Sequence, residues 1–160
     1  ITDPTWHINP CAVKEVLQKI SSNNWVKVNR QYYTKWTAKV WQDGELIYED
    51  TLDLNNKRVY IAFESKSLGD TIAWMPYVEE FRKKHNCTVI CSTFWNKILD
   101  YPEIEFVEPG TMVGCYCLYT LGWHWNEDKE PTLCNTIPLQ QSASNILGLD
   151  YVGLDINSLE

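Results

Sequence analysis

Residues 57–86, KRVYIAFESKSLGDTIAWMPYVEEFRKKHN, decide the fold of this chain. They begin with the short apolar run 59–63, which is typical of a strand covered on both faces. A polar turn around residues 67–70, SLGD, comes next, and a helical spacing of apolar residues follows it. A strand, a tight turn and a helix in this order predict the first unit of an open α/β sheet, in which ligands bind at the carboxyl ends of the strands.

The helix expected after Asp70 buries one side and exposes the other. Its apolar side holds Ile72, Met75, Val78 and Phe81. Pro76 lies within this pattern and leaves two alternatives: the main helix begins near Pro76, or it is kinked there. Basic residues at the end of the segment suit the dipole of a helix C-terminus.

The pattern repeats further along the chain. We expect strands at 87–92 and 104–107, a short helix at 94–99 and a last helix at 138–147. Residues 110–135 are expected to be irregular, because they are rich in aromatic residues and Cys. The resulting β-α-β-α-β order has connections short enough for a parallel sheet with right-handed crossovers.

In the residues before position 57, the apolar residues follow different spacings. Apolar residues at helical spacing predict a helix over residues 11–20. Between residues 25 and 54 the apolar residues alternate with polar ones, and Asp43-Gly44 marks a hairpin turn. We therefore expect two parts: a helix and β-hairpin module over residues 1–56, and a Rossmann-like domain over residues 57–160.

Composition excludes some functions. The chain has 160 residues, of which 44% are apolar, so it can bury a core. Its net charge of −7 argues against binding to nucleic-acid phosphates. No apolar run approaches the ~20 residues of a membrane span, and no signal peptide is visible. Because the chain begins with Ile1, we expect it to be a piece of a longer polypeptide or a processed product.

Six Cys leave the redox state open between disulfides and free thiols. They lie at positions 11, 87, 91, 115, 117 and 134. Without a secretion signal, reduced thiols in a cytoplasmic protein are favoured over disulfides. The set Cys115, Cys117, His124 and Cys134 fits no standard zinc spacing, so we predict no metal site.

Asp70 is the first candidate functional residue, because it lies on the strand-to-helix turn. A carboxylate there can take a proton from a hydroxyl group, and Gly69 leaves room for a substrate. The plain alternative is that Asp70 caps the helix. Lys66, with Ser65 or Ser67, can contact a phosphate or a sugar hydroxyl, although exposed loops commonly carry such residues.

The segment 123–128, WHWNED, is the second candidate. Aromatic rings such as that of Trp123 stack on the apolar faces of sugars, and the neighbouring polar residues can bind hydroxyl groups. Long irregular segments in compact domains are often functional. The alternative is an aromatic surface loop that serves packing alone.

Residues 63–82, FESKSLGDTIAWMPYVEEFR, resemble the N-terminal motif of the glycosyltransferase family 9 heptosyltransferases, and more closely that of the autotransporter O-heptosyltransferases. The motif is specific because Gly-Asp lies at the strand-helix junction and Pro follows Asp70 by six residues. Other segments agree, and the resemblance covers roughly residues 25–151. These segments are residues 44–50, 89–96, 104–110, 137–143 and 146–149.

The resemblance implies a GT-B architecture of two Rossmann-like halves. It implies ADP-heptose as the donor and transfer of the heptose to a Ser hydroxyl of a protein acceptor. The Asp of this Gly-Asp motif is the proposed general base of the family, so the resemblance implies that role for Asp70. Loop neighbours would shape the acceptor side: Ser67, Leu68, Gly69 and Thr71.

The chain departs from the family because it stops near the end of the first half. The nucleotide-sugar site of such enzymes lies mostly in the other half, and their cysteine-rich iron site has no counterpart here. We therefore expect no cofactor in this chain and a missing donor-binding domain or chain as a partner, besides the protein acceptor. The alternative is a non-catalytic binding or assembly module, and in either case we expect a homo-oligomer.

Overall fold

The structure is a computed structural model, and it describes residues 5–8, 16–21, 23–132 and 134–152. The chain divides into two compact units. The first comprises Ile1–Asn29 with Thr34–Asp53, and the second comprises Arg30–Tyr33 with Leu54–Glu160. The second unit therefore begins shortly before the boundary expected at residue 57, and it also takes in a short upstream segment.

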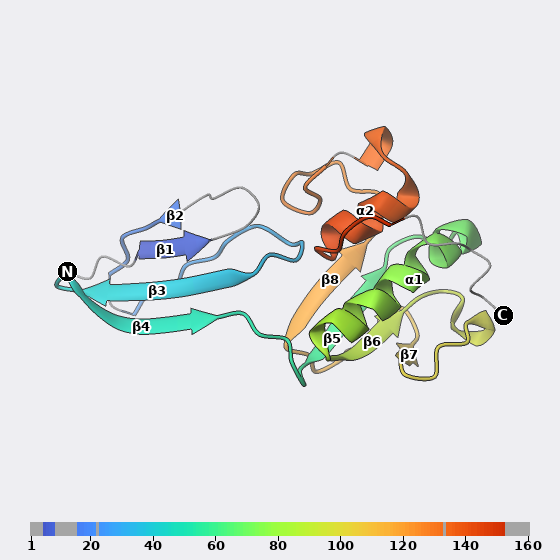
Figure 1. Ribbon diagram of the computed structural model, residues 1–160, viewed down its shortest axis with the longest axis horizontal. Coiled ribbons are helices and arrows are strands. Elements are labelled where there is room, and N and C mark those ends of the chain that lie inside the picture. Colours follow the sequence, from blue (N-terminus) through green and yellow to red (C-terminus); the bar gives the residue numbers. More distant parts are fainter. Residues whose placement is uncertain (1–4, 9–15, 22, 133, 153–160) are drawn as a thin grey trace. The chain divides into compact units, whose positions relative to one another are not determined.

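The first unit is an antiparallel sheet with the strand order β2-β1-β3-β4 (Figure 1). Its strands are β1 Thr5–Ile8, β2 Val16–Leu17, β3 Trp36–Gln42 and β4 Glu45–Thr51. Strands β3 and β4 form the predicted hairpin. Asp43 and Gly44 join them with φ values of 52° and 86°, and two consecutive left-handed residues are what a type I′ hairpin turn requires.

The helix expected over residues 11–20 is wrong where the structure describes this segment. Residues 11–15 lie outside the described residues, but Val16–Leu17 form strand β2, in which Leu17 lies opposite Thr5 of β1. The apolar spacing covers only ten residues and is a weak signal. Backbone pairing with a neighbouring strand overrides it.

The second unit contains a parallel sheet with the strand order β7-β6-β5-β8 (Figure 1). Three of its strands are the ones predicted: β5 Arg58–Phe63, β6 Thr88–Ser92 and β7 Glu105–Val107. Strand β5 is central, and its residues between Val59 and Phe63 are mostly buried. The sequence therefore predicted the covered central strand correctly.

The fourth strand, β8 Cys117–Leu121, corrects the expectation that residues 110–135 are irregular. It pairs with β5 in parallel, from Val59 opposite Cys117 to Phe63 opposite Leu121. Tyr119 and Leu121 are buried, whereas Thr120 between them is half-buried and Leu118 before them is 53% exposed. This alternation is typical of an edge strand, but it covers only five residues within a segment rich in Cys and aromatic side chains.

Helix α1, Leu68–His85, is one continuous helix. It begins after the N-cap residue Ser67 and ends at Asn86, whose left-handed φ of 46° closes the helix. Pro76 lies inside it, so the alternative in which the main helix begins near Pro76 is wrong. Pro76 lacks the N–H that would bond to the carbonyl of Ile72, and packing of the helix offsets this loss.

The remaining helices are short. The helix expected at 94–99 is a single 3-10 turn, η1 Asn96–Ile98. A second 3-10 turn, η2 Cys134–Thr136, precedes the expected last helix, α2 Leu139–Ile146. Gly148 follows α2 with a left-handed φ of 62°, as expected of a residue just beyond a helix C-terminus.

The core lies between the parallel sheet and its helices. Helix α1 packs on one sheet face, where Trp74 meets Phe63 edge to face at 5.4 Å between ring centroids. On the same face Phe81 meets Tyr119 at 5.6 Å. Helix α2 packs against both α1 and β8. These contacts fix the carboxyl end of the sheet, where the candidate site lies.

Two further findings concern the state of the cysteines and the character of the helices among the described residues. Cys87, Cys91, Cys115 and Cys117 are free thiols. Within the described ranges, no helix combines the length and the apolar character that crossing a membrane requires.

Candidate functional site

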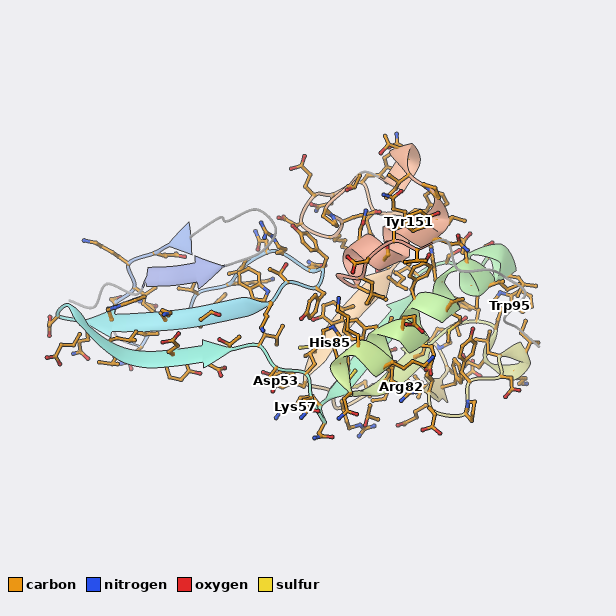
Figure 2. The ribbon with its side chains drawn as sticks, in the orientation of Figure 1. Asp53, Lys57, Arg82, His85, Trp95 and Tyr151 are labelled. Atoms are coloured by element: carbon orange, nitrogen blue, oxygen red, sulfur yellow. The ribbon has the colours of Figure 1, made fainter. Side chains whose placement is uncertain are left out.

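The turn between β5 and α1 is held by hydrogen bonds from its neighbours. The N–H of Ser67 donates to Oγ of Ser65 at 3.0 Å. The indole N–H of Trp95 donates to the carbonyl of Lys66 at 2.9 Å. Figure 2 shows Trp95 beside the N-terminal end of α1, and His85 at the opposite end of that helix. These two hydrogen bonds hold the loop at the carboxyl end of β5.

Asp70 does not serve as the helix cap. The N-cap is Ser67, whose Oγ accepts the N–H of Asp70 at 3.4 Å. The carboxylate of Asp70 instead accepts the indole N–H of Trp123 through Oδ2 at 3.2 Å. Asp70 is 8% exposed and Trp123 is 49% exposed. The structure thus brings together Asp70 and Trp123, one from each of the two candidate regions, although they are 53 positions apart in the chain.

The other predicted loop residues divide into an outer and an inner group. Lys66, Ser67 and Gly69 are exposed, and Leu68 is half-buried. The ammonium group of Lys66 lies 5.4 Å from the ring centroid of Phe94, a cation–π contact. A Cβ at Gly69 would meet only Oγ of Ser67 at 3.6 Å. The outer face of the turn is therefore open beside Asp70.

Thr71 belongs to the inner group. It is fully buried, and its hydroxyl donates to the carbonyl of Ser67 at 3.2 Å. Its Oγ1 also lies 3.3 Å from Oγ1 of Thr93, which is equally buried at the end of β6. Thr93 accepts the N–H of Trp95 at 3.2 Å. Thr71 thus ties the start of α1 to the neighbouring strand.

The loop after β8 reaches the site because it continues the pairing with β5. The N–H of Glu64 donates to the carbonyl of Leu121 at 2.8 Å, one step beyond the paired strands. At Gly122 a Cβ would lie 3.1 Å from Cβ of Glu64 and 3.3 Å from the ring of His124. The backbone segments at Gly122 and Glu64 approach closely here, which favours glycine at position 122. Trp123 follows Gly122 directly.

His124 anchors the loop from the inside. It is 4% exposed, and its Nε2 lies 3.2 Å from the carbonyl of Thr120. Its Nδ1 lies 3.6 Å from Oε2 of Glu64, and Nζ of Lys129 lies 3.7 Å from the other carboxylate oxygen. Because Glu64 directly follows β5, these contacts connect the loop to the end of the central strand.

Glu130 is a buried carboxylate further along the same loop. It is 2% exposed, and its Oε1 accepts the hydroxyl of Ser142 at 2.6 Å. Its Oε2 is buried without a hydrogen-bond partner among the described residues. Burial raises the pKa of Glu130, while the hydrogen bond from Ser142 and the nearby His124 act against this rise. The loop is therefore also fastened to helix α2.

The sequence does not single out Glu64, Glu130 or Ser142. Glu64 has a local signal, because an acidic residue directly follows the predicted strand 59–63. Glu130 and Ser142 have none, since their contact depends on how α2 packs. In the described part of the chain, no group of three or more His, Cys, Asp or Glu side chains lies close enough to hold a metal ion.

Comparison with known proteins shows which proteins this chain resembles. No protein-family model matches the chain. The autotransporter heptosyltransferase TibC of Escherichia coli O78:H11 is 31% identical over 137 residues, a match that covers 79% of this chain and 34% of TibC. The autotransporter heptosyltransferase Aah of Escherichia coli is 31% identical over 163 residues, which cover 90% of this chain and 40% of Aah.

The chain is related to the autotransporter heptosyltransferases. The resemblance stated from its motifs is thereby confirmed. The inactive autotransporter heptosyltransferase BimC of Burkholderia thailandensis is 28% identical over 134 residues, covering 78% of this chain and 32% of BimC. The chain spans only 32–40% of the length of these curated relatives.

Solved structures agree with the sequence matches. TibC from enterotoxigenic Escherichia coli H10407, an iron-containing dodecameric glycosyltransferase, superposes with a TM-score of 0.73 at 26% identity, over 91% of this chain and 42% of TibC. TibC in complex with ADP-D-β-D-heptose gives a TM-score of 0.71 at 26% identity, over 91% and 41% of the two chains. The predicted fold class, a β-hairpin module followed by the parallel-sheet part of a glycosyltransferase, is confirmed.

Proposed function

We propose that this chain is the acceptor-side part of a glycosyltransferase that moves a heptose-like sugar from a nucleotide-sugar to a protein Ser hydroxyl. The observation that carries the proposal is the position of Asp70. Its carboxylate lies at the carboxyl end of the central strand and is not used as a helix cap. Open α/β sheets bind their ligands at this edge.

Asp70 acts as the general base. Its carboxylate removes the proton from the acceptor hydroxyl as the hydroxyl oxygen attacks the anomeric carbon of the donor. The bond between that carbon and the nucleoside diphosphate breaks, and the diphosphate leaves with the bonding electrons. The exposed side of the turn, formed by Lys66, Ser67 and Gly69, faces the acceptor.

The donor is ADP-heptose, held by a domain outside this chain. Support comes from TibC, which has been solved with ADP-D-β-D-heptose and of which this chain covers less than half. We further propose that the complete protein is a homo-oligomer, because TibC is dodecameric. A cytoplasmic location, where nucleotide-sugars are made, is part of the same proposal.

The test uses the complete protein with ADP-D-β-D-heptose and an autotransporter passenger domain as the acceptor probe. Released ADP and the intact mass of the passenger report transfer. Asp70→Asn should lower the rate by about 100- to 10,000-fold, the usual contribution of a general base. Asp43→Asn is the matched control, since Asp43 is an exposed turn residue whose left-handed backbone Asn also tolerates.

An unchanged rate in the Asp70→Asn protein would remove Asp70 from the mechanism. Absence of transfer in the wild-type protein, together with no rise in melting temperature on adding ADP-D-β-D-heptose, would favour the non-catalytic binding module. That second candidate is supported by one relative, BimC, which is named as inactive.

A further inference from the structure

Trp123 has a specific relationship with Asp70 that its aromatic character alone does not explain. Its indole N–H donates to Oδ2 of Asp70 at 3.2 Å. Among the described residues, it is the one side chain that donates to this carboxylate. Trp123 follows β8 and Asp70 follows β5, two neighbouring parallel strands. The pairing of these two strands therefore brings the indole N–H of Trp123 to the carboxylate of Asp70.

The indole N–H bonds to one specific oxygen of the Asp70 carboxylate, Oδ2. An indole nitrogen donates but does not accept, and it does not titrate in the physiological range. Oδ2 must therefore act as an acceptor whether Asp70 is ionised or protonated. A carboxylate torsion is otherwise broad and roughly two-fold, so this hydrogen bond selects one orientation and leaves Oδ1 to receive a proton.

The position of Trp123 is set by its neighbours in the chain. Gly122 before it lies close to Glu64, where a Cβ would leave only 3.1 Å. His124 after it is buried and contacts both Glu64 and the carbonyl of Thr120. The indole is thus held between two anchored residues while 49% of its surface stays exposed.

We propose that Trp123 is a positioning residue that orients the carboxylate of Asp70 for proton transfer. The inference rests on the function proposed above. In the transfer step, the proton of the acceptor hydroxyl moves to Oδ1 of Asp70, while Oδ2 keeps its bond to the indole. The acceptor oxygen bonds to the anomeric carbon, and the nucleoside diphosphate leaves with the electron pair of the broken bond.

This role differs from the one that the sequence predicts for Trp123. Stacking on a sugar uses the face of the indole ring, whereas positioning Asp70 uses the N–H at its edge. A substitution that keeps an aromatic face but removes the N–H separates the two roles. Trp123→Phe is that substitution, and Trp25→Phe is the matched control, because Trp25 is 79% exposed and lies outside both candidate segments.

The experiment measures heptose transfer by the complete protein, with ADP-D-β-D-heptose and an autotransporter passenger domain as probes. Trp123→Phe should lower kcat by about 10- to 100-fold, as expected when a charged group loses a hydrogen bond. KM should change by less than about two-fold, because positioning acts on the transition state. Trp25→Phe should leave both constants within about two-fold. Full kcat in Trp123→Phe would overturn the inference.

A double-mutant cycle shows whether Trp123 acts through Asp70. If it does, adding Trp123→Phe to Asp70→Asn causes no further loss. An equal loss in both backgrounds would mean an independent role and would contradict the inference. If Asp70→Asn alone keeps full activity, the proposed function fails instead, so the two failures are distinct.

A spectroscopic measurement covers the case in which the Phe variant folds poorly. In protein labelled with ¹⁵N at the indole nitrogens, the Trp123 resonance should shift in Asp70→Asn, because its acceptor is altered from a charged to a neutral group. The Trp25 resonance should stay in place. An unmoved Trp123 resonance would show that the hydrogen bond does not form.

Discussion

The hydroxyl of Ser142 in α2 donates to the carboxylate of Glu130 at 2.6 Å, and both residues are almost fully buried. The loop that carries Trp123 is thereby fastened at its far end to a helix of the core. Because burial raises the pKa of Glu130 against the opposing effect of the Ser142 hydrogen bond, the buried carboxyl group makes stability depend on pH.

Replacing Glu130 by Gln should reduce this pH dependence. A raised pKa in the folded state means that the folded protein binds more protons than the unfolded chain. The contribution of Glu130 is therefore complete below its ordinary value of 4.5 and is lost as the pH rises through the raised pKa. Urea midpoints between pH 4 and pH 8 should fall less in Glu130→Gln than in the wild type.

The control for this measurement is Glu127→Gln, a change at an exposed glutamate of the same loop. It should follow the wild-type curve. Parallel curves for the wild type and Glu130→Gln would mean that Glu130 is not buried as an ionisable group.

Glu79 should give the opposite pH dependence. Its carboxylate accepts two hydrogen bonds from Arg82, at 2.7 and 2.8 Å, and this contact lowers the pKa of Glu79. A lowered pKa contributes stability above the ordinary value, and this stability is lost as the pH falls through the lowered pKa. Glu79→Gln should thus destabilise the protein at pH 7, and the difference from the wild type should shrink in acid.

Glu80→Gln is the control for Glu79, because its side chain is 51% exposed and pairs only with Lys83 among the described residues. Its effect should be within about 0.5 kcal/mol, as for exposed ion pairs. Equal effects of the two changes on urea midpoints would contradict the special role of the Arg82 contact.

Gly148→Ala should destabilise the protein strongly. Gly148 has a φ of 62°, and a Cβ there would overlap the ring of Tyr33. Strain at a left-handed position and overpacking together cost about 2–4 kcal/mol. Gly110 is a matched control with a φ of 87° and no atom within 4 Å of a Cβ.

Gly110→Ala should therefore lower the free energy of unfolding by about 1 kcal/mol, the cost of the left-handed backbone conformation alone. The difference between the two variants in urea unfolding isolates the contact with Tyr33. Equal costs would show that Tyr33 moves aside without loss.

The thiols should differ in reactivity. Burial raises the pKa of Cys87 to about 11 and that of Cys91 further, and both are at most 5% exposed. At pH 8 a thiol with a pKa near 11 is a thiolate in about one molecule in a thousand. Iodoacetamide should therefore label the exposed Cys115 at least about ten-fold faster than Cys87 in native protein.

Peptide mass spectrometry gives the extent of labelling at each position over time. In 8 M urea the difference between Cys115 and Cys87 should vanish, because burial is removed. Rapid labelling of Cys87 in the native protein would mean that the start of β6 opens easily.

Much of the second unit follows from local sequence. The apolar run 59–63 and the helical spacing after Asp70 each dictate their element, because the side-chain period and the cap are encoded within a few residues. The Asp43-Gly44 turn is equally local. Strand β8 was missed because its five residues gain their identity from pairing with β5.

The candidate site also combines features that the local sequence encodes with contacts that only the folded structure creates. The sequence by itself determined that Asp70 lies on a strand-to-helix turn, and the motif around it determined the resemblance to heptosyltransferases. Only the tertiary structure decided that Trp123 donates to Asp70 and that Glu130 meets Ser142. The physical reason is that these contacts join segments whose distance is set by strand order and helix packing, and no local pattern of residues encodes that distance.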